Sequence, residues 1–409
     1  MKILITTDAY DSMINGVAVS VNNLSDALRN AGNEVRILTL SQTHQSYRNG
    51  DVYYIRSFPL KIYPDARATF ALNDSFVEEL IEWQPDVIHS QCEFFTFLFA
   101  CKIAKHTNAP VIHTYHTLYE CYTHYFCPSE KLGRKVVAAV TRFVCNHTDA
   151  VIAPTKKTAD ILENYEVTAP IYVIPTGLNL GHLQLPSYNV AAASLKENLK
   201  IPNNVPVLIT LGRVAREKNI DFVLNQMATP AMRNAKAHLV IVGDGPDRER
   251  LEALVHNLKL QNTVHFTGMV KPDEVGKYYR IGDIFVSASQ SETQGLTYIE
   301  AMACGLPLLC RKDSCLDSVL IPGSNGYFFE TGDEFAKSFA KLTCSKEHLG
   351  ALSSRAYQSS KLFSKETFAE RALCLYKNTI SEKEHVKKHF HFPYFPKMHW
   401  EKIYGILNR

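Results

Sequence analysis

Two glutamates, Glu292 and Glu300, stand eight positions apart in the segment SETQGLTYIE. Good helix formers follow the glycine of this segment and end at Gly305 before Pro307, which indicates a helix end. Glu300 is therefore expected inside a helix and Glu292 in the loop before it. Eight helical residues would rise roughly 12 Å, more than the about 5 to 9.5 Å between the paired carboxylates of glycosidases. The glutamates are predicted instead to accept hydrogen bonds from hydroxyl groups at two places along one ligand, such as a sugar or a ribose.

Two cations, Arg213 and Lys218, follow an apolar run in the segment LGRVAREKNI. Arginine can hold a diphosphate with two hydrogen bonds and lysine can add a point charge, although two solvated surface cations are the alternative. Gly243 and Gly245 in VGDGP follow the next apolar run and either let the backbone approach a ligand or make a tight turn. Gly16 ends the loop DAYDSMING beside a helix start, where free N–H groups favour anions; a simple turn is again the alternative.

Histidines lie among aromatic residues in the segment HTYHTLYECYTHYF, after the apolar run PVI. Of His113, His116 and His124, one at a strand end could hydrogen-bond a sugar hydroxyl or a leaving phosphate, and structural histidines in a polar loop are the alternative. None of the 10 cysteines has C-x-x-C spacing, so no zinc site is predicted. The start MKILITTDAY resembles a buried strand and not a secretion signal, so we expect reduced thiols in a cytoplasmic protein.

The next segment, SEKLGRKVVAAVTRFVCNH, sets a basic face beside an apolar one. Such a helix suits the plane of an anionic membrane, whereas a core-facing helix with a solvated basic side is the alternative. The net charge of +3 is too small to predict nucleic-acid binding, and no apolar run of about 18 residues predicts a membrane span. The cations of this helix are Lys131, Arg134, Lys135 and Arg142.

The elements that must position these residues alternate between short apolar runs and helical patterns, and the alternation restarts in the second half. At 409 residues the chain is long enough for two domains. We predict an α/β fold of two doubly wound, Rossmann-like parallel-sheet domains that face each other across a cleft, with ligands at the carboxyl ends of the strands. The absence of G-x-G-x-x-G disfavours a nicotinamide or flavin dinucleotide. The predicted domains are residues 1–177 and 178–367, with a turn-rich crossover at 178–204 and with 368–409 packing back on the first domain.

Taken in order along the chain, these segments resemble the retaining glycosyltransferases of family four, which have the GT-B fold. The resemblance covers nearly the whole chain and includes the family's glutamate-x7-glutamate motif. It implies that Glu300 binds the ribose of a nucleotide and Glu292 the hexose. It also implies that Arg213 and Lys218 hold the diphosphate and stabilise its charge as it leaves, without a metal or another cofactor. The donor site implied comprises Gly16, Arg213, Lys218, Gly243, Gly245, Glu292, Gly295, Leu296 and Glu300.

The histidine-rich segment and the basic helix narrow the resemblance to bacterial diacylglycerol glucosyltransferases. This likeness implies transfer of a hexose, with UDP-glucose as the expected donor, to diacylglycerol at the inner face of the cell membrane, with His116 beside the reacting hexose. Another acceptor, either a glycosylated lipid, a phosphatidylinositol-type lipid or a soluble molecule, stays open, as does a non-catalytic nucleotide-sugar-binding protein. Gln294 departs from a frequent phenylalanine of the family, which affects the expected donor preference. The acceptor and membrane residues implied are His116, Tyr119, Tyr122, His124, Lys131, Arg134, Lys135 and Arg142.

Overall fold

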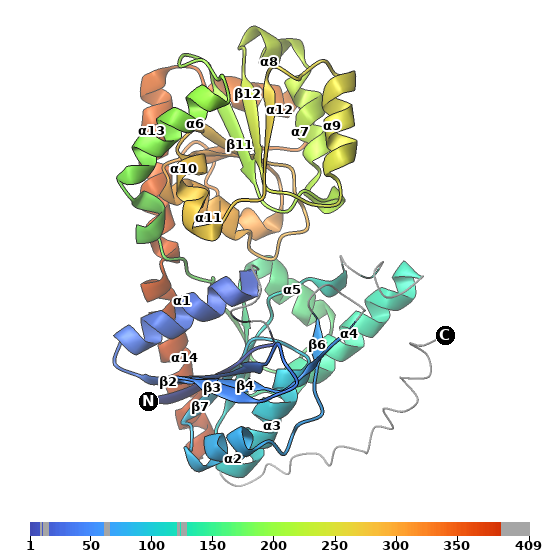
Figure 1. Ribbon diagram of the computed structural model, residues 1–409, viewed down its shortest axis with the longest axis vertical. Helices are drawn as coiled ribbons and strands as arrows, with labels where there is room; N and C mark the ends of the chain where they lie inside the picture. Colours follow the sequence, from blue (N-terminus) through green and yellow to red (C-terminus); the bar gives the residue numbers. More distant parts are fainter. Residues whose placement is uncertain (9, 11–15, 61–65, 121–122, 124–128, 386–409) are drawn as a thin grey trace.

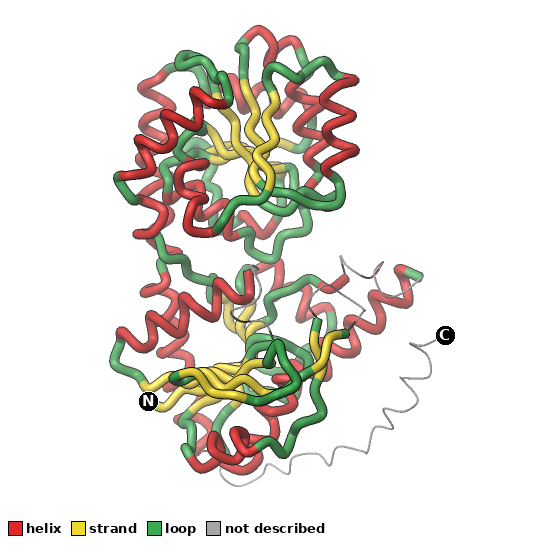
Figure 2. The backbone as a smooth tube through the Cα atoms, in the orientation of Figure 1, coloured by secondary structure: helices red, strands yellow, loops and turns green. Residues whose placement is uncertain are grey.

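The computed structural model of the protein describes residues 1–8, 10, 16–60, 66–120, 123 and 129–385. Two lobes are stacked along the long axis of the molecule, and each is built around its own sheet (Figures 1 and 2). The predicted fold class, two doubly wound parallel-sheet units with helices on their faces, is confirmed.

The first sheet has eight strands in the order β10-β9-β8-β7-β1-β2-β4-β3, and all neighbours are parallel except β3 and β4. The strand order changes direction between β1 and β7, which is the switch point of a doubly wound sheet. A short hairpin, β5 (Phe58–Pro59) with β6 (Arg67–Ala68), stands apart from this sheet. The strands of the sheet are β1 (Lys2–Thr6), β2 (Glu34–Leu40), β3 (Tyr47–Asn49), β4 (Val52–Ile55), β7 (Val87–Ser90), β8 (Val111–Thr114), β9 (Ala150–Ala153) and β10 (Ile171–Val173).

Helices cover both faces of the first sheet because alternate residues of its strands point to opposite faces. In β1, Ile3 and Ile5 pack with Leu24 of α1, whereas Leu4 packs with Phe99 of α3 on the other face. The strands are therefore apolar throughout, as expected of a sheet that is buried on both sides. The helices of this lobe are α1 (Gly16–Asn30), α2 (Ser75–Glu82), α3 (Phe95–Thr107), α4 (Glu130–Asn146) and α5 (Lys156–Asn164).

The second sheet has six parallel strands in the order β13-β12-β11-β14-β15-β16. This is the 3-2-1-4-5-6 order of the Rossmann fold, and its switch point lies between β11 and β14. The strands are β11 (Val207–Leu211), β12 (His238–Val242), β13 (Val264–Gly268), β14 (Ile284–Ser287), β15 (Leu308–Arg311) and β16 (Gly326–Phe329). Its helices are α6 (Ser187–Asn198), α7 (Ile220–Met227), α8 (Pro230–Asn234), α9 (Arg248–Asn257), α10 (Val275–Tyr279), α11 (Leu296–Ala303), α12 (Gly332–Leu342) and α13 (Lys346–Ser360). The 3-10 turns are η2 (Gly181–Gln184), η3 (Arg216–Lys218), η4 (Pro272–Glu274), η5 (Ser314–Leu316) and η6 (Lys361–Phe363).

The stretch 178–204, predicted as a turn-rich crossover, contains the 12-residue helix α6. Its Tyr188 is buried and packs on α10, where a Cβ added to Gly276 would lie 2.3 Å from the tyrosine ring. The polar residues and the early proline of this stretch hid a helix that packs on the second lobe through Tyr188 and Ala192.

The chain crosses between the lobes twice, and the two crossings lie against each other. The Leu178 N–H donates to the Phe363 carbonyl at 2.9 Å, and the Lys365 N–H donates to the Leu178 carbonyl at 2.9 Å. A Cβ on Gly177 would lie 2.5 Å from the Ser364 carbonyl oxygen, so the contact requires glycine there. After the second crossing, the chain returns to the lobe in which it began.

The helix α14 (Lys365–His385) packs against α1 of the first lobe, which it crosses in Figure 1. Phe368, Ala372 and Tyr376 of this helix are buried in the same cluster as Ile3 and Leu24. Residues 386–409 lie outside the described part of the chain. The core of the first lobe is therefore completed by residues from the end of the described chain.

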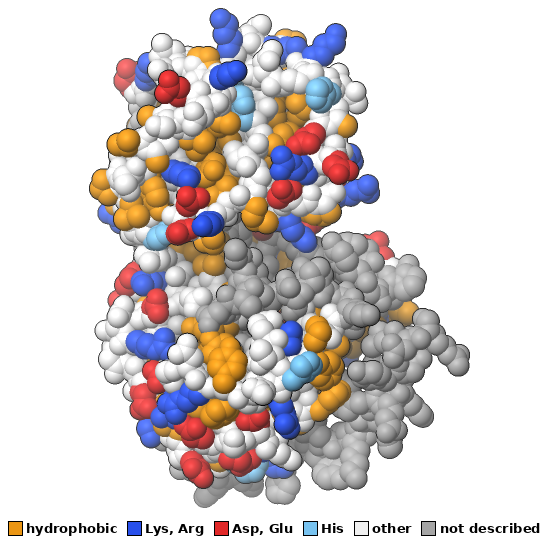
Figure 3. All heavy atoms as spheres, viewed as in Figure 1, with side chains coloured by type: hydrophobic (Ala, Val, Ile, Leu, Met, Phe, Trp, Pro, Cys, Tyr) orange, Lys and Arg blue, Asp and Glu red, His pale blue; other side chains and the backbone are white. Residues whose placement is uncertain are grey.

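None of the helices in the described part of the chain combines the length and the apolar character that crossing a bilayer requires. On the face seen in Figure 3, basic and acidic side chains are interspersed, in keeping with the small net charge.

Replacing Phe368 by alanine should lower the free energy of unfolding of the first lobe by about 3 to 5 kcal/mol, because it opens a cavity in a close-packed core. Urea denaturation followed by tryptophan fluorescence measures this change, since Trp83 is buried in the first lobe. Leu362, whose side chain is 60% exposed, provides the control, and its alanine variant should unfold at the wild-type urea concentration. Equal stability of the Phe368→Ala protein would contradict the packing of α14.

Candidate active site

A cavity of about 1250 Å³ lies between the two lobes and has residues of both in its walls. In the first lobe its walls include Asp8 after β1 and Glu93 after β7. In the second lobe they include Arg213 after β11 and Glu292 after β14. All four residues follow strands at the two switch points, where doubly wound sheets bind ligands. A narrowing between the two lobes is visible in Figure 3.

The connection after β14 brings Glu292 to Lys218. Lys218 Nζ donates to Glu292 Oε1 at 2.5 Å, and only 27% and 18% of the two side chains are exposed. Lys218 ends the turn η3, and Arg213 in the same connection forms an ion pair with Glu217. The two cations predicted to hold a diphosphate thus line the same cavity as the glutamate predicted to hold a hexose.

Glu300 lies inside α11 and Glu292 in the loop before it, as predicted. The Tyr279 hydroxyl, at the end of α10, donates to Glu300 Oε2 at 2.7 Å. Burial raises the pKa of Glu300, and the hydrogen bond from Tyr279 lowers this pKa in part. A poorly solvated carboxylate fixed in the cavity wall is well suited to accept hydrogen bonds from the hydroxyls of a ligand. Tyr279 had no signal in the sequence.

Gly295 stands immediately before α11 with a φ of +72°. A Cβ at this position would lie 2.3 Å from the ring of Tyr298. Both the left-handed backbone and the ring therefore require glycine. The turn presents the first residue of α11, Leu296, to the cavity.

Gly243 and Gly245 also line the cavity, but the protein itself accounts for their lack of side chains. A Cβ on Gly243 would lie 2.0 Å from the Gly212 carbonyl oxygen, and one on Gly245 would lie 2.3 Å from the Val214 carbonyl oxygen. These glycines let the connections after β11 and β12 pack together, which favours the structural alternative for them.

Gly16 is the first residue of α1 and reaches the cavity from the other lobe. A Cβ at Gly16 would lie 3.8 Å from Leu296 Cδ1, an ordinary contact distance. Packing therefore does not require glycine here, and its predicted role in ligand approach stays a prediction. The loop residues 11–15 before it lie outside the described residues.

His116 lies on the first-lobe wall of the cavity, after β8. Its Nε2 is 2.6 Å from Oε1 of Gln91, so the imidazole donates its proton there and keeps Nδ1 as an acceptor. Burial lowers the pKa of His116 to about 4; Glu93 raises this pKa and His113 lowers it. The ring is therefore uncharged at neutral pH and can act through hydrogen bonds.

Two carboxylates that the sequence analysis missed, Asp8 and Glu93, stand in the cavity wall near His116. Burial raises the pKa of Asp8 to about 6, against hydrogen bonds from Thr96 that lower it. Glu93 Oε2 accepts a hydrogen bond at 2.7 Å from the hydroxyl of Tyr119, a predicted acceptor-side residue. Both carboxylates follow predicted strands at the edge where ligands bind, and that position was a usable signal for them.

The predicted basic helix is α4, and its apolar residues divide between two sides. Val137 and Val144 are buried, whereas Val136, Val140 and Phe143 are about half exposed. A helix that served only to pack on the core would bury most of its apolar residues. Val136, Val137 and Val140 also line the cavity, so α4 contributes an apolar end to it.

The four predicted cations of α4 are all exposed. Arg134 forms an ion pair with Glu130 on the same helix, and Arg142 forms one with Glu166. The remaining two cations are Lys131 and Lys135. The predicted acceptor residues Tyr122 and His124 lie outside the described residues.

Within the described part of the chain, no group of three or more histidine, cysteine or acidic side chains is arranged to hold a metal ion. The described cysteines are free. The expected absence of a metal or another cofactor stays a prediction.

Comparison with known proteins gives matches across both lobes. The family model described as Glycosyltransferase Family 4 matches residues 14–182, and the model described as Glycosyl transferases group 1 matches residues 192–359. The chain is 32% identical over 394 residues to the alpha-monoglucosyldiacylglycerol synthase of Acholeplasma laidlawii, a match that covers 93% of this chain and 98% of that protein. It is 33% identical over 386 residues to the synthase of the same name from Streptococcus pneumoniae R6, covering 93% and 86%.

Among solved structures, Anabaena HepE in complex with UDP and glucose matches with a TM-score of 0.71 over 92% of this chain and 100% of that one. The two chains are 16% identical, so this likeness concerns the fold alone.

When His116 is replaced by asparagine, the free energy of unfolding should fall less as the pH is lowered than it does in the wild type. The pKa of His116 is lowered to about 4 in the folded protein against an ordinary value of 6.5, so the unfolded chain binds the proton first as the pH falls. Protonation of this histidine therefore lowers the free energy of unfolding by on the order of 1 to 2 kcal/mol between about pH 6.5 and pH 5. Urea denaturation at pH 7 and pH 5 measures the difference between variant and wild type.

The same substitution at the exposed His44 is the control. Identical pH dependence of the wild type and the His116→Asn protein would contradict a buried, neutral His116.

Proposed function

This chain belongs to glycosyltransferase family four, with the GT-B fold, and from that membership we propose that it transfers a hexose from a nucleotide sugar to a lipid hydroxyl. The proposed donor is UDP-glucose, the acceptor is diacylglycerol, and the product is a glycolipid made at the cytoplasmic surface of an anionic membrane. The relatives named alpha-monoglucosyldiacylglycerol synthase support this acceptor and the transfer of glucose.

One observation carries the proposal: a single cavity joins the glutamates and cations of the second lobe to the exposed apolar side of α4. Its polar end contains Glu300, Lys218 and Arg213, which can hold the ribose and the diphosphate of a nucleotide sugar. Its other end contains Val136 and Val140, which suit the acyl chains of a lipid. A soluble acceptor would have no use for this apolar end.

In the proposed reaction, the lipid hydroxyl oxygen bonds to C1 of the hexose as the bond from C1 to the diphosphate oxygen breaks. The acceptor attacks on the face from which the diphosphate leaves, so the configuration at C1 is retained. The electron pair of the broken bond stays on the diphosphate, whose negative charge Arg213 and Lys218 stabilise without a metal ion. The hydroxyl proton passes to a diphosphate oxygen.

The remaining residues of the cavity hold the substrates during this transfer. Glu292 would accept hydrogen bonds from the hexose, and its pair with Lys218 keeps carboxylate and cation at one place. Neutral His116 would hydrogen-bond the hexose or the acceptor through Nδ1, with its ring fixed by Gln91. Such fixed partners reduce the reorganisation that the transition state requires.

Membrane binding is proposed to occur through α4. Its cations attract an anionic surface, with on the order of 1 kcal/mol for each residue near the lipid headgroups. The half-exposed Val136, Val140 and Phe143 can enter the boundary between headgroups and acyl chains. The cavity would then open where diacylglycerol resides.

Replacing Lys218 or Arg213 by alanine should lower transfer by 10²- to 10³-fold, on the order of the loss seen when a group that stabilises developing charge is removed. The assay incubates the full chain with labelled UDP-glucose and liposomes that contain diacylglycerol, and it counts label in the organic phase. Lys337→Ala, at an exposed position of α12, is the control. Activity within a few-fold of wild type in either cation variant would overturn the diphosphate role.

Further arms of that assay test the finer points of the proposal. Other nucleotide sugars and lipids replace UDP-glucose and diacylglycerol, and a chelator is added in a parallel reaction. An α-linked product and full activity with chelator are expected. UDP binding without transfer to any acceptor would favour a non-catalytic nucleotide-sugar-binding protein.

Reversing the charge of Lys131 and Lys135 by glutamate should weaken binding to anionic liposomes by on the order of 30-fold or more, as expected from the loss of two surface cations. Sedimentation with liposomes rich in an anionic lipid measures this binding. The matched control reverses Lys337 and Lys341 on α12, in the other lobe, and should sediment like the wild type. Unchanged sedimentation of the Lys131 and Lys135 variant would assign α4 a structural role only.

A further inference from the structure

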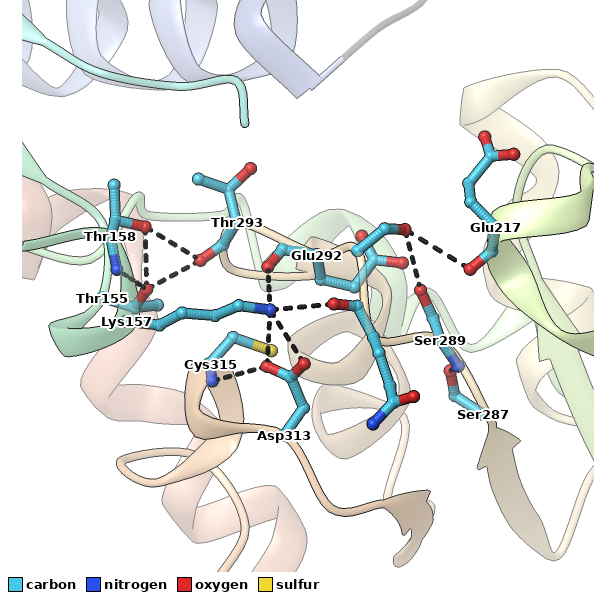
Figure 4. A network of polar contacts seen from close by, with 12 residues as sticks. Thr155, Lys157, Thr158, Glu217, Ser287, Ser289, Glu292, Thr293, Asp313 and Cys315 are labelled. Atoms are coloured by element: carbon cyan, nitrogen blue, oxygen red, sulfur yellow. Dashed lines mark hydrogen bonds and ion pairs between the residues drawn. The ribbon is translucent and has the colours of Figure 1, made fainter. Parts of the chain in front are cut away.

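The loop that carries Glu292 belongs to the second lobe, yet the first lobe holds it. Residues 290–294 follow β14, and hydrogen bonds reach them from the start of α5 (Figure 4). Further hydrogen bonds reach them from the crossing at Thr176. Most of these bonds end on main-chain atoms of the loop. They therefore fix the path of the backbone independently of which side chains the loop carries.

Lys157, in the first turn of α5, makes the central contacts. Its Nζ donates to the carbonyl of Gln290 at 2.9 Å and to that of Glu292 at 3.4 Å. The same nitrogen contacts both carboxylate oxygens of Asp313, at 2.9 and 2.8 Å. Only 15% of the lysine and 7% of the aspartate side chain are exposed, so the pair is shielded from water. A shielded ion pair is sensitive to the exact position of both partners.

Neighbouring contacts extend this attachment along the loop. The Thr155 hydroxyl, just before α5, donates to the Thr293 carbonyl at 2.8 Å. The amide side chain of Gln294 pairs with Thr176 twice, accepting from its N–H at 2.8 Å and donating to its carbonyl at 3.0 Å. Gln294 is the residue at which this chain departs from the family's frequent phenylalanine, and the structure gives it a specific partner in the crossing.

We propose that Lys157 is a positioning residue, which aligns the donor-binding loop of the second lobe with the acceptor side of the first. Glu292 is hydrogen-bonded to both lobes. Its carbonyl accepts from Lys157 of the first lobe, and its carboxylate accepts from Lys218 of the second. A shift of the loop would therefore move the proposed hexose ligand and the proposed diphosphate ligand together. The inference rests on the proposed transfer reaction for its catalytic meaning, and on the contacts alone for its structural meaning.

The neighbouring Lys156 lies at the same helix end but is not proposed to position the loop. Its side chain is 64% exposed and pairs with Asp160 of its own helix. Lys157 instead turns from its helix to the other lobe, with acceptors there that come from two separate connections, after β14 and after β15. The two lysines thus form a matched pair for experiment.

The test compares Lys157→Met, which keeps the aliphatic stem and removes the charge, with Lys156→Met in the full chain. We expect Lys157→Met to lower kcat by 10- to 100-fold, the range expected when reacting groups are displaced by about 1 Å. The Kd for UDP should change by less than about threefold, because Arg213, Lys218 and Glu300, which are proposed to hold the nucleotide, all belong to the second lobe. Lys157→Arg should recover part of the lost kcat, since it restores the charge.

A second measurement needs no substrate. Hydrogen exchange of the peptide that covers residues 288–296 should quicken in Lys157→Met and stay at the wild-type rate in Lys156→Met. If Lys157→Met does not fold, Asp313→Asn takes its place and should show the same two effects more weakly.

Equal exchange rates and equal kcat in the two methionine variants would overturn the proposal, as would a loss of UDP affinity as large as the loss of kcat. Failure of the wild type to transfer glucose to any lipid would instead count against the proposed function, and hydrogen exchange would still test the attachment of the loop.

Discussion

Parallel strands that end at a common edge fix where this protein can do chemistry. Each lobe has a single point at which its strand order changes direction, and only there do neighbouring connections diverge enough to leave room for a ligand. Because the two lobes face each other with these edges, Asp8 and Glu93 of one lobe line the same cavity as Arg213 and Glu292 of the other. The reaction site is thus a property of the pair of lobes, and neither sheet contains it alone.

Within this frame, burial sets the electrostatic character of each wall. On the first-lobe side it keeps His116 uncharged and raises the pKa of Asp8. On the second-lobe side the carboxylates are matched with donors, Glu292 with Lys218 and Glu300 with the Tyr279 hydroxyl. The cations of the second-lobe wall therefore lie where the proposed leaving diphosphate would gain charge, and the first-lobe wall offers the uncharged ring of His116 to the proposed sugar and acceptor. This division suits a reaction in which negative charge develops on one substrate only.

Much of this could be predicted from the sequence because its causes are local. The glycine before α11 and the helix formers after it placed Glu292 and Glu300 correctly, and the alternating apolar runs predicted both sheets. The helix α6 was missed, since the polar residues and the proline at its start resemble a turn-rich connection. The partners of the site residues were missed for a different reason: Tyr279 with Glu300 and Lys157 with Asp313 are contacts between distant segments, and no local pattern encodes them.

The paired crossings at Leu178 and Ser364 have a mechanical consequence. Two covalent connections that are hydrogen-bonded to each other behave as one hinge, because they cannot lengthen and resist being pulled apart separately. The second lobe is in effect an insertion between β10 and α14, and rotation about this axis is the movement that the crossings allow, with the first lobe as a base. Rotation about this axis would change the width of the gap least beside the crossings, where Gln294 pairs with Thr176, and the contacts of Lys157 with the loop after β14 would oppose it.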